Sequence, residues 1–96
     1  MNTEIKEVIV YTIKNEFEKE YGKVQHIVKS CLEGMAGFKG VHSFRSCSKA
    51  NQLMDWVVWD NYENAKEAEK EFEKHPQFGL LMNYLEEMKF SDHFKN

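Results

Sequence analysis

The strongest structural signal in the chain is LMDWVVWDNYENA, residues 53–65. The segment 53–59 is rich in β-branched and aromatic side chains, a composition typical of a strand within a sheet. Asp60 and Glu63 then have the spacing of a helix capping box. The segment therefore predicts a strand that leads directly into a helix. The buried stripe expected on that helix consists of Tyr62, Ala65, Ala68 and Phe72.

A strand and a helix are predicted upstream of this segment. Ile5–Ile13 is apolar on both faces of a strand, so we expect both faces to be covered. Asn15 and Glu18 repeat the capping spacing and predict the start of a helix, which Gly34 should end. The apolar stripe expected on this helix consists of Phe17, Tyr21, Val24, Val28, Cys31 and Met35.

Further strands are predicted on either side of the second helix. Val41–Ser48 should pair antiparallel with residues 53–59 through the polar connection 49–52. Pro76 cannot continue a helical hydrogen-bond ladder, so the second helix should stop near His75, and Gly79–Leu85 can form a further turn or two. Glu86–Phe94 then alternates as a last strand. Its two expected faces carry Met88, Phe90 and Phe94 on one side and Lys89, Ser91 and His93 on the other.

The resulting order, β-α-β-β-α-β, is that of a ferredoxin-like α+β fold with a four-stranded antiparallel sheet. The length of 96 residues fits a single domain, residues 1–96. Two helices in this arrangement cover one face of the sheet and leave the other face bare. Because apolar side chains occupy both faces of the strands, the bare face would be a large exposed patch. We therefore expect a twofold homodimer that packs through its sheet faces.

Composition and charge exclude several classes of function. The 13 basic and 16 acidic residues give a net charge of −3, which argues against a nucleic-acid binder. No apolar run reaches the length of a membrane span, and the polar N-terminus does not read as an export signal. We expect a soluble cytoplasmic protein that has no membrane partner. In that compartment the two cysteines, Cys31 and Cys47, should be reduced thiols.

Three short segments carry a resemblance to a known family. They are GFKG at 37–40, VWDNYENA at 58–65 and HPQF at 75–78. Together with the predicted element order, they resemble the dimeric α+β barrels related to antibiotic biosynthesis monooxygenases. The resemblance implies oxidation of a small aromatic or quinol-type substrate without a metal or flavin cofactor. In that family a Trp usually ends the third strand, here Trp59, and an aromatic follows the break after the second helix, here Phe78.

Such a site requires aromatic walls, a proton acceptor and a donor for a developing oxyanion. The candidate catalytic residues are Asp55 as the base, His75, and Arg45 as the oxyanion donor. The family tends to have an amide near the Trp, so Asp55 departs from its pattern. Each candidate also has a purely structural interpretation: a solvated strand edge for Asp55, helix capping for His75 and a salt bridge for Arg45. The candidate substrate-binding residues are Trp59, Tyr62, Trp56 and Phe78.

Several alternatives can be weighed on the same residues. A non-catalytic dimer that binds a small apolar ligand fits the fold equally well. A haem-degrading relative would use Asn15 and His75, but residues 67–74 contain no Trp and Pro76 breaks the expected helix. No C-x-x-C or H-x-x-x-H spacing favours a metal site, and we predict none. The RNA-recognition motif is excluded because residues 53–60 contain no glycine and no basic residue.

Overall fold

The computed structural model describes residues 3–96 of the chain. Its order confirms the predicted β-α-β-β-α-β arrangement and the ferredoxin-like α+β class, with two short helices added. The elements are β1 (Ile5–Ile13), the 3₁₀ helix η1 (Asn15–Glu20), α1 (Tyr21–Leu32), β2 (Phe38–Arg45), β3 (Gln52–Trp59), α2 (Tyr62–Lys74), α3 (Phe78–Tyr84) and β4 (Leu85–Lys95).

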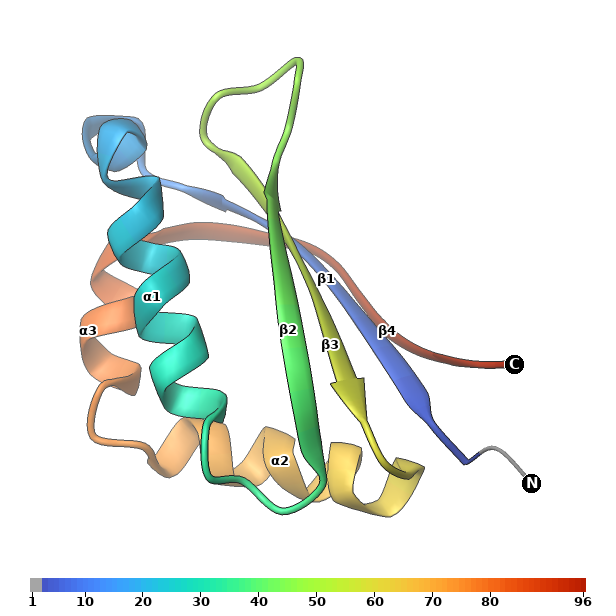
Figure 1. Cartoon of the computed structure of the whole chain (residues 1–96). Coiled ribbons are helices and arrows are strands. Elements are labelled where there is room, and N and C mark those ends of the chain that lie inside the picture. Colours follow the sequence, from blue (N-terminus) through green and yellow to red (C-terminus); the bar gives the residue numbers. More distant parts are fainter. Residues whose placement is uncertain (1–2) are drawn as a thin grey trace.

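The four strands form one antiparallel sheet in the order β2-β3-β1-β4. Figure 1 shows α1, α2 and α3 on one side of this sheet. In the register, Asp55 of β3 lies between Ile9 of β1 and Ser43 of β2. Because side chains alternate along a strand, Glu7, Ile9 and Tyr11 face the same side as Asp55, which is the helix side. We call this side the inner face and the opposite side the outer face.

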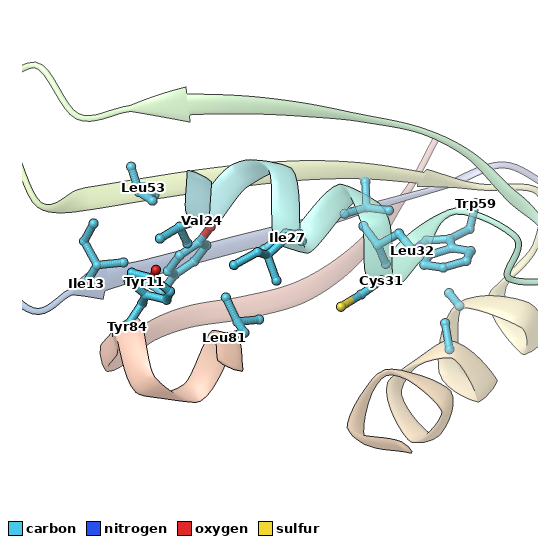
Figure 2. Close-up of a cluster of buried hydrophobic side chains, with 14 of the residues drawn as sticks. Tyr11, Ile13, Val24, Ile27, Cys31, Leu32, Leu53, Trp59, Leu81 and Tyr84 are labelled. Atoms are coloured by element: carbon cyan, nitrogen blue, oxygen red, sulfur yellow. The ribbon is translucent and has the colours of Figure 1, made fainter. Parts of the chain in front are cut away.

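The hydrophobic core lies between the inner face and the helices. It extends from Ile13 and Tyr84 at one end of the sheet to Trp59 at the other (Figure 2). Trp59, Ile13, Leu53, Val24, Val57, Asp55 and Cys31 are its largest fully buried side chains. Asp55 is the polar residue among these side chains, and packing of the core does not require a carboxylate at this position.

Two helix starts differ from the sequence prediction. The capping box expected at Asn15 and Glu18 is wrong: these residues lie in η1, whose N-cap is Lys14 without a side-chain cap bond. At α2 the cap is displaced by one residue from Asp60 to Asn61, whose Oδ1 accepts from the Asn64 N–H at 2.8 Å. Asp60 bonds the Asn64 side-chain amide instead, at 2.9 Å.

Two strands also differ in detail. β2 spans Phe38–Arg45 rather than 41–48, because Ser46 turns the chain by accepting from the N–H groups of Ser48 and Lys49. The pairing of β4 with β1 contains a register shift. Val10 pairs with Phe90, whereas the next residue, Tyr11, pairs with Met88. The strict alternation predicted for this strand is therefore wrong at Met88, which lines the helix side of the sheet, whereas Phe90 stays on the outer face.

The outer face is apolar, as the sequence predicts. Phe44, Trp56, Phe90 and Phe94 lie there with exposures between 41% and 46%, and the Phe90 and Phe94 rings stack at a centroid distance of 6.3 Å. No element of residues 3–96 covers these side chains (Figure 1). Within the same residues, none of the helices is both long and apolar enough to cross a membrane.

Candidate functional site

A cavity of about 410 Å³ opens between the inner face of the sheet and the three helices. Its wall is mostly apolar and includes Trp59, Phe72 and Phe78. The acidic groups on this wall are Glu7, Asp55, Glu69 and Glu73. An apolar hollow with a few convergent polar groups is the usual form of a small-molecule site.

Asp55 is held deep in this wall. Its side chain is 1% exposed, and both carboxylate oxygens accept hydrogen bonds. The Tyr11 hydroxyl donates to Oδ2 at 2.9 Å and the Ser43 hydroxyl donates to Oδ1 at 2.8 Å. Burial raises the pKa of Asp55 above its ordinary value, and the two donors offset part of that effect. Burial and the neighbouring carboxylate also raise the pKa of Tyr11, so this phenol stays a donor.

Trp59 is fully buried and connects the cavity to a second acidic group. Its indole Nε1–H donates to Oε1 of Glu7 at 3.0 Å. Glu7 is itself buried, and this burial raises the pKa of its carboxyl group. The edge of the Phe38 ring meets Trp59 at a centroid distance of 5.8 Å, which fixes the indole from the side of β2.

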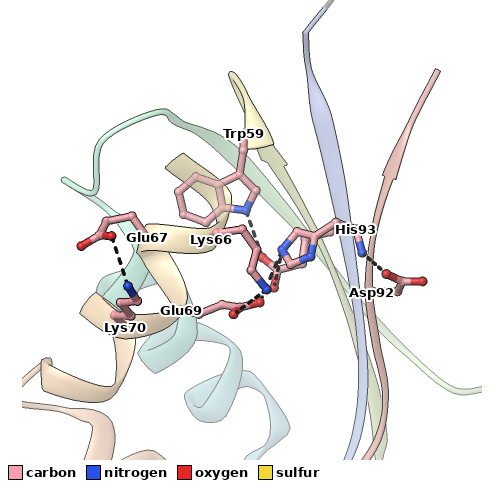
Figure 3. A network of polar contacts seen from close by, with 8 residues as sticks. Trp59, Lys66, Glu67, Glu69, Lys70, Asp92 and His93 are labelled. Atoms are coloured by element: carbon pink, nitrogen blue, oxygen red, sulfur yellow. Dashed lines mark hydrogen bonds and ion pairs between the residues drawn. The ribbon is translucent and has the colours of Figure 1, made fainter. Parts of the chain in front are cut away.

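Glu7, Glu69 and His93 form a cluster of polar side chains from β1, α2 and β4. Figure 3 shows Glu69 and His93 pointing toward each other. His93 of β4 places Nε2 3.5 Å from Oε2 of Glu7 and 3.7 Å from Oε1 of Glu69 on α2. The His93 side chain is 9% exposed, and its Nε2 has no hydrogen-bond partner among residues 3–96. A position near the C-terminus predicts an exposed side chain for His93, and the structure shows that this prediction is wrong.

Three of the predicted site residues line the cavity. Asp55, Trp59 and Phe78 come together there from β3 and α3. The spacing of Asp55 and Trp59 on one strand face allowed this prediction, since residues four apart on a strand point the same way. Their proposed roles remain predictions.

The other predicted residues lie outside the cavity. His75 caps α2, accepts from the Gln77 N–H at 3.1 Å and lies 3.5 Å from the Cys31 sulfur. Arg45 stacks on the Tyr21 ring, with its Cζ 4.1 Å from the ring centroid. Trp56 faces outward on the other side of the sheet, and Tyr62 is 50% exposed with its ring edge-on to His93.

Sequence analysis missed Glu7, Tyr11, Ser43 and the Glu69–His93 pair. Glu7 had a detectable signal, because alternation places it on the same face as Ile9 and Tyr11 of an otherwise apolar strand. Ser43 and Tyr11 become partners of Asp55 only through the register of three strands. Glu69 and His93 are brought together by the crossing of α2 over β4, and no local spacing encodes that contact.

Comparisons with known proteins give different results for the sequence of this chain and for its structure. No protein-family model and no curated protein matches the sequence. Solved structures match closely in fold. One is named "Putative antibiotic biosynthesis monooxygenase" from Bordetella bronchiseptica, with a TM-score of 0.77 and 15% identity over 98% of this chain and 97% of that one. Another of the same name, from Nitrosomonas europaea, has a TM-score of 0.75 and 5% identity over 100% of this chain and 92% of that one.

A third structure adds a named activity. SnoaB from Streptomyces nogalater, named a cofactor-independent oxygenase, has a TM-score of 0.68 and 20% identity over 96% of this chain and 89% of that one. At these identities the comparison establishes the fold. The resemblance to the antibiotic biosynthesis monooxygenases is thus confirmed at the level of architecture, and the chemistry has to be argued from the cavity itself.

Proposed function

We propose that this protein binds a small electron-rich aromatic molecule, a phenol or quinol, in the cavity and oxidises it with dioxygen. The observation that carries the proposal is the buried carboxylate of Asp55 in the apolar wall that Trp59 and Phe78 share. A cavity of about 410 Å³ has the size of a small-molecule site. Indole and phenyl rings can stack on a flat ligand.

Asp55 serves as the proton acceptor in this proposal. A carboxylate with a raised pKa is a stronger base than an ordinary one. Removing a phenolic proton makes the ring electron-rich enough to react with dioxygen. The ring then loses two hydrogens and gains one oxygen atom, so a hydroxyarene and O₂ yield a quinone and water without an external reductant. The two oxygen atoms are accounted for by the new carbonyl and by the water.

The fold supports this choice among the possible reactions. A structure of the same fold is named a cofactor-independent oxygenase. Most of the wall is apolar, and surroundings of low polarity strengthen the interaction of a phenolate with nearby dipoles. Tyr11 and Ser43 hold the carboxylate in one orientation, which favours proton transfer at a defined position.

A non-catalytic ligand-binding protein is the second candidate. It is favoured by the fact that both oxygens of Asp55 already accept hydrogen bonds and that Arg45, the predicted oxyanion donor, lies away from the cavity. In that case the same hollow would hold an apolar aromatic molecule without changing it.

One variant separates the two candidates. Asp55→Asn keeps the size of the side chain and removes the base. We expect it to bind hydroxylated naphthoquinols with little change in affinity, measured by quenching of tryptophan fluorescence. Oxygen uptake should fall about 10²- to 10⁴-fold, the usual contribution of a general base. Glu16→Gln, an exposed carboxylate-to-amide change in η1, is the matched control. Equal uptake by Asp55→Asn and wild type would refute the role of Asp55.

We also propose that two copies associate through their outer faces. The support is the row of half-exposed aromatic side chains on a face that no element of residues 3–96 covers. A self-complementary apolar face is the usual surface of a twofold dimer.

A further inference from the structure

The cluster of Glu7, Glu69 and His93 lies at the edge of the cavity and has no part in the oxidation proposed above. Its three ligand-type atoms lie within 4.8 Å of one another. They come from β1, α2 and β4, which meet only in the folded chain. His93 presents a side chain that is nine-tenths buried, with its Nε2 aimed at both carboxylates and unpartnered among residues 3–96. A buried polar atom in such a state requires an explanation.

The distances do not fit direct hydrogen bonds. Nε2 lies 3.5 Å and 3.7 Å from the two carboxylate oxygens, whereas N–H···O bonds have lengths of about 2.7 to 3.2 Å. They are closer to the edges of a coordination polyhedron, for which the two carboxylate oxygens, now within 4.8 Å of each other, would have to approach. Zinc bonds to His nitrogen and carboxylate oxygen measure about 2.0 to 2.2 Å, so ligand atoms in a tetrahedral site lie about 3.3 to 3.6 Å apart. Small side-chain movements would bring all three atoms to that spacing.

One oxygen of each carboxylate already has a partner, and the other oxygen points toward His93. Oε1 of Glu7 accepts from the Trp59 indole at 3.0 Å, which leaves Oε2 directed at His93. Oε2 of Glu69 pairs with the Lys66 ammonium at 3.1 Å, which leaves Oε1 directed at the same nitrogen. Metal-binding carboxylates are commonly oriented in this way by donors in the surrounding shell.

Charge also favours a cation at this point. Two carboxylates and one imidazole face each other, and the Lys66 ammonium, which pairs with Oε2 of Glu69 and lowers the pKa of Glu7, offsets only one of the two carboxylate charges. Burial disfavours the charged form of Glu7, and a divalent ion beside its carboxylate would offset that cost. The mixed nitrogen and oxygen donors suit zinc and its first-row neighbours better than magnesium or calcium.

We propose that Glu7, Glu69 and His93 form a binding site for one divalent transition-metal ion of the zinc type, with water completing the coordination. The ion would link β1, α2 and β4 at the rim of the cavity. This site is independent of the oxidation of an aromatic ligand, and either proposal can fail without the other.

The test is titration of the full chain with Zn²⁺ after dialysis against a chelator, followed by isothermal calorimetry. We expect one ion per chain. His93→Ala should weaken zinc binding more than about 100-fold, since loss of a surrounding-shell partner alone costs about 10- to 100-fold. Glu69→Gln should weaken zinc binding at least about 10-fold. Because the Glu69 side chain is half-exposed, we expect this variant to fold like wild type.

Two variants serve as controls. Glu67→Gln changes an exposed carboxylate on the same helix that pairs with Lys70, and it should bind zinc like wild type. His75→Ala removes the imidazole beside the Cys31 sulfur and tests whether that pair takes up the metal instead. Circular dichroism of each variant reports on folding without metal.

Co²⁺ gives a second, spectroscopic measurement. A four-coordinate site of nitrogen and oxygen ligands should give wild type a visible absorption band that His93→Ala and Glu69→Gln lack. Zinc binding that is absent, or that is unchanged in both of these variants, would overturn the proposal. The cluster would then be a set of polar contacts between three elements that holds no metal.

Discussion

Asp55 is the clearest case of a residue that the free energy of folding alone does not favour. An isolated carboxylate at 1% exposure costs folding free energy, and the hydroxyls of Tyr11 and Ser43 compensate only in part. An amide or an apolar side chain would fill the same space at lower cost. A buried acid with a raised pKa that lines a cavity is therefore a candidate functional group on physical grounds.

The pH dependence of stability tests this description of Asp55. Its pKa in the folded chain is above its ordinary value of 3.8, so the folded state holds the proton more tightly than the unfolded state. The stabilisation is complete below the ordinary pKa and is lost as pH rises through the folded pKa. The unfolding free energy of wild type minus that of Asp55→Asn should therefore decrease from about pH 4 towards neutral pH and then level off. Urea unfolding of both proteins across that range measures it, and a difference that does not change with pH would contradict the account.

For single residues, the sequence predicts the face of the strand on which a side chain lies better than it predicts which residues that side chain contacts. Alternation correctly puts Asp55 and Trp59 on one face, and the same rule puts Trp56 on the other. Alternation also puts Arg45 on the inner face with Ser43, but it does not show that this residue, at the end of β2, stacks on Tyr21 away from the cavity. His75 lies at the end of α2, where strand alternation gives no placement. Glu69 and His93 are 24 residues apart, and only the packing of α2 on β4 makes them neighbours.

The junction between β3 and α2 determines where the helix lies above the cavity. Gly37, before β2, has a φ of +82°, and a Cβ there would clash with Oδ1 of Asp60 and lie 2.6 Å from Nδ2 of Asn64. The Asp60 N–H donates to the Gly37 carbonyl at 2.9 Å. The loop before β2 therefore packs directly on the first turn of α2, and glycine is required by both conformation and space.

Gly34 and Gly37 allow the cost of the left-handed conformation to be separated from the cost of close packing. Gly34 has a φ of +88° but no atom within 4 Å of its Cβ position. We expect Gly34→Ala to lower the unfolding free energy by about 1 to 2 kcal/mol, the cost of a left-handed Ala. Gly37→Ala should cost at least about 1 kcal/mol more, since Asp60 and Asn64 must also move. Denaturant unfolding measures both, and equal losses would show that the junction is not tightly packed.

Element boundaries follow the sequence less closely than element types. The periodicities of α1 and α2 and the β-branched run of β3 are long enough to determine their type. The bulge in β4 and the early start of β2 depend on hydrogen bonds between strands and on a Ser46 turn, which alternation does not describe. The α2 cap is displaced because Asp60 and Asn61 are both good caps, and tertiary contact with Gly37 decides between them.

The whole molecule has two different faces. The inner face is covered by helices and contains the cavity, whereas the outer face presents Phe44, Trp56, Phe90 and Phe94. The sequence predicts an exposed apolar outer face because its strands are apolar on both sides and the helices cover only one of them. It does not show what covers the outer face, and the proposed dimer answers that question.

Sedimentation velocity tests the dimer. At micromolar concentration wild type should sediment as about twice its mass of 11.4 kDa. Trp56→Glu places a charge in the centre of the proposed interface and should shift the protein towards monomer. Leu80→Glu is the matched control, since Leu80 is 46% exposed, against 41% for Trp56, but lies on α3, on the helix side of the sheet. A wild-type particle of monomer mass, or the same shift for both variants, would disprove the interface.

Turnover in the cavity is the central claim, and the most direct measurement is oxygen consumption by the purified wild-type chain. The substrates are a panel of hydroxylated naphthoquinols at neutral pH. The account predicts that at least one of them is consumed faster than in buffer, at a rate proportional to protein concentration and with one quinone formed for each O₂ used. Rates equal to those in buffer for every member of the panel would contradict it.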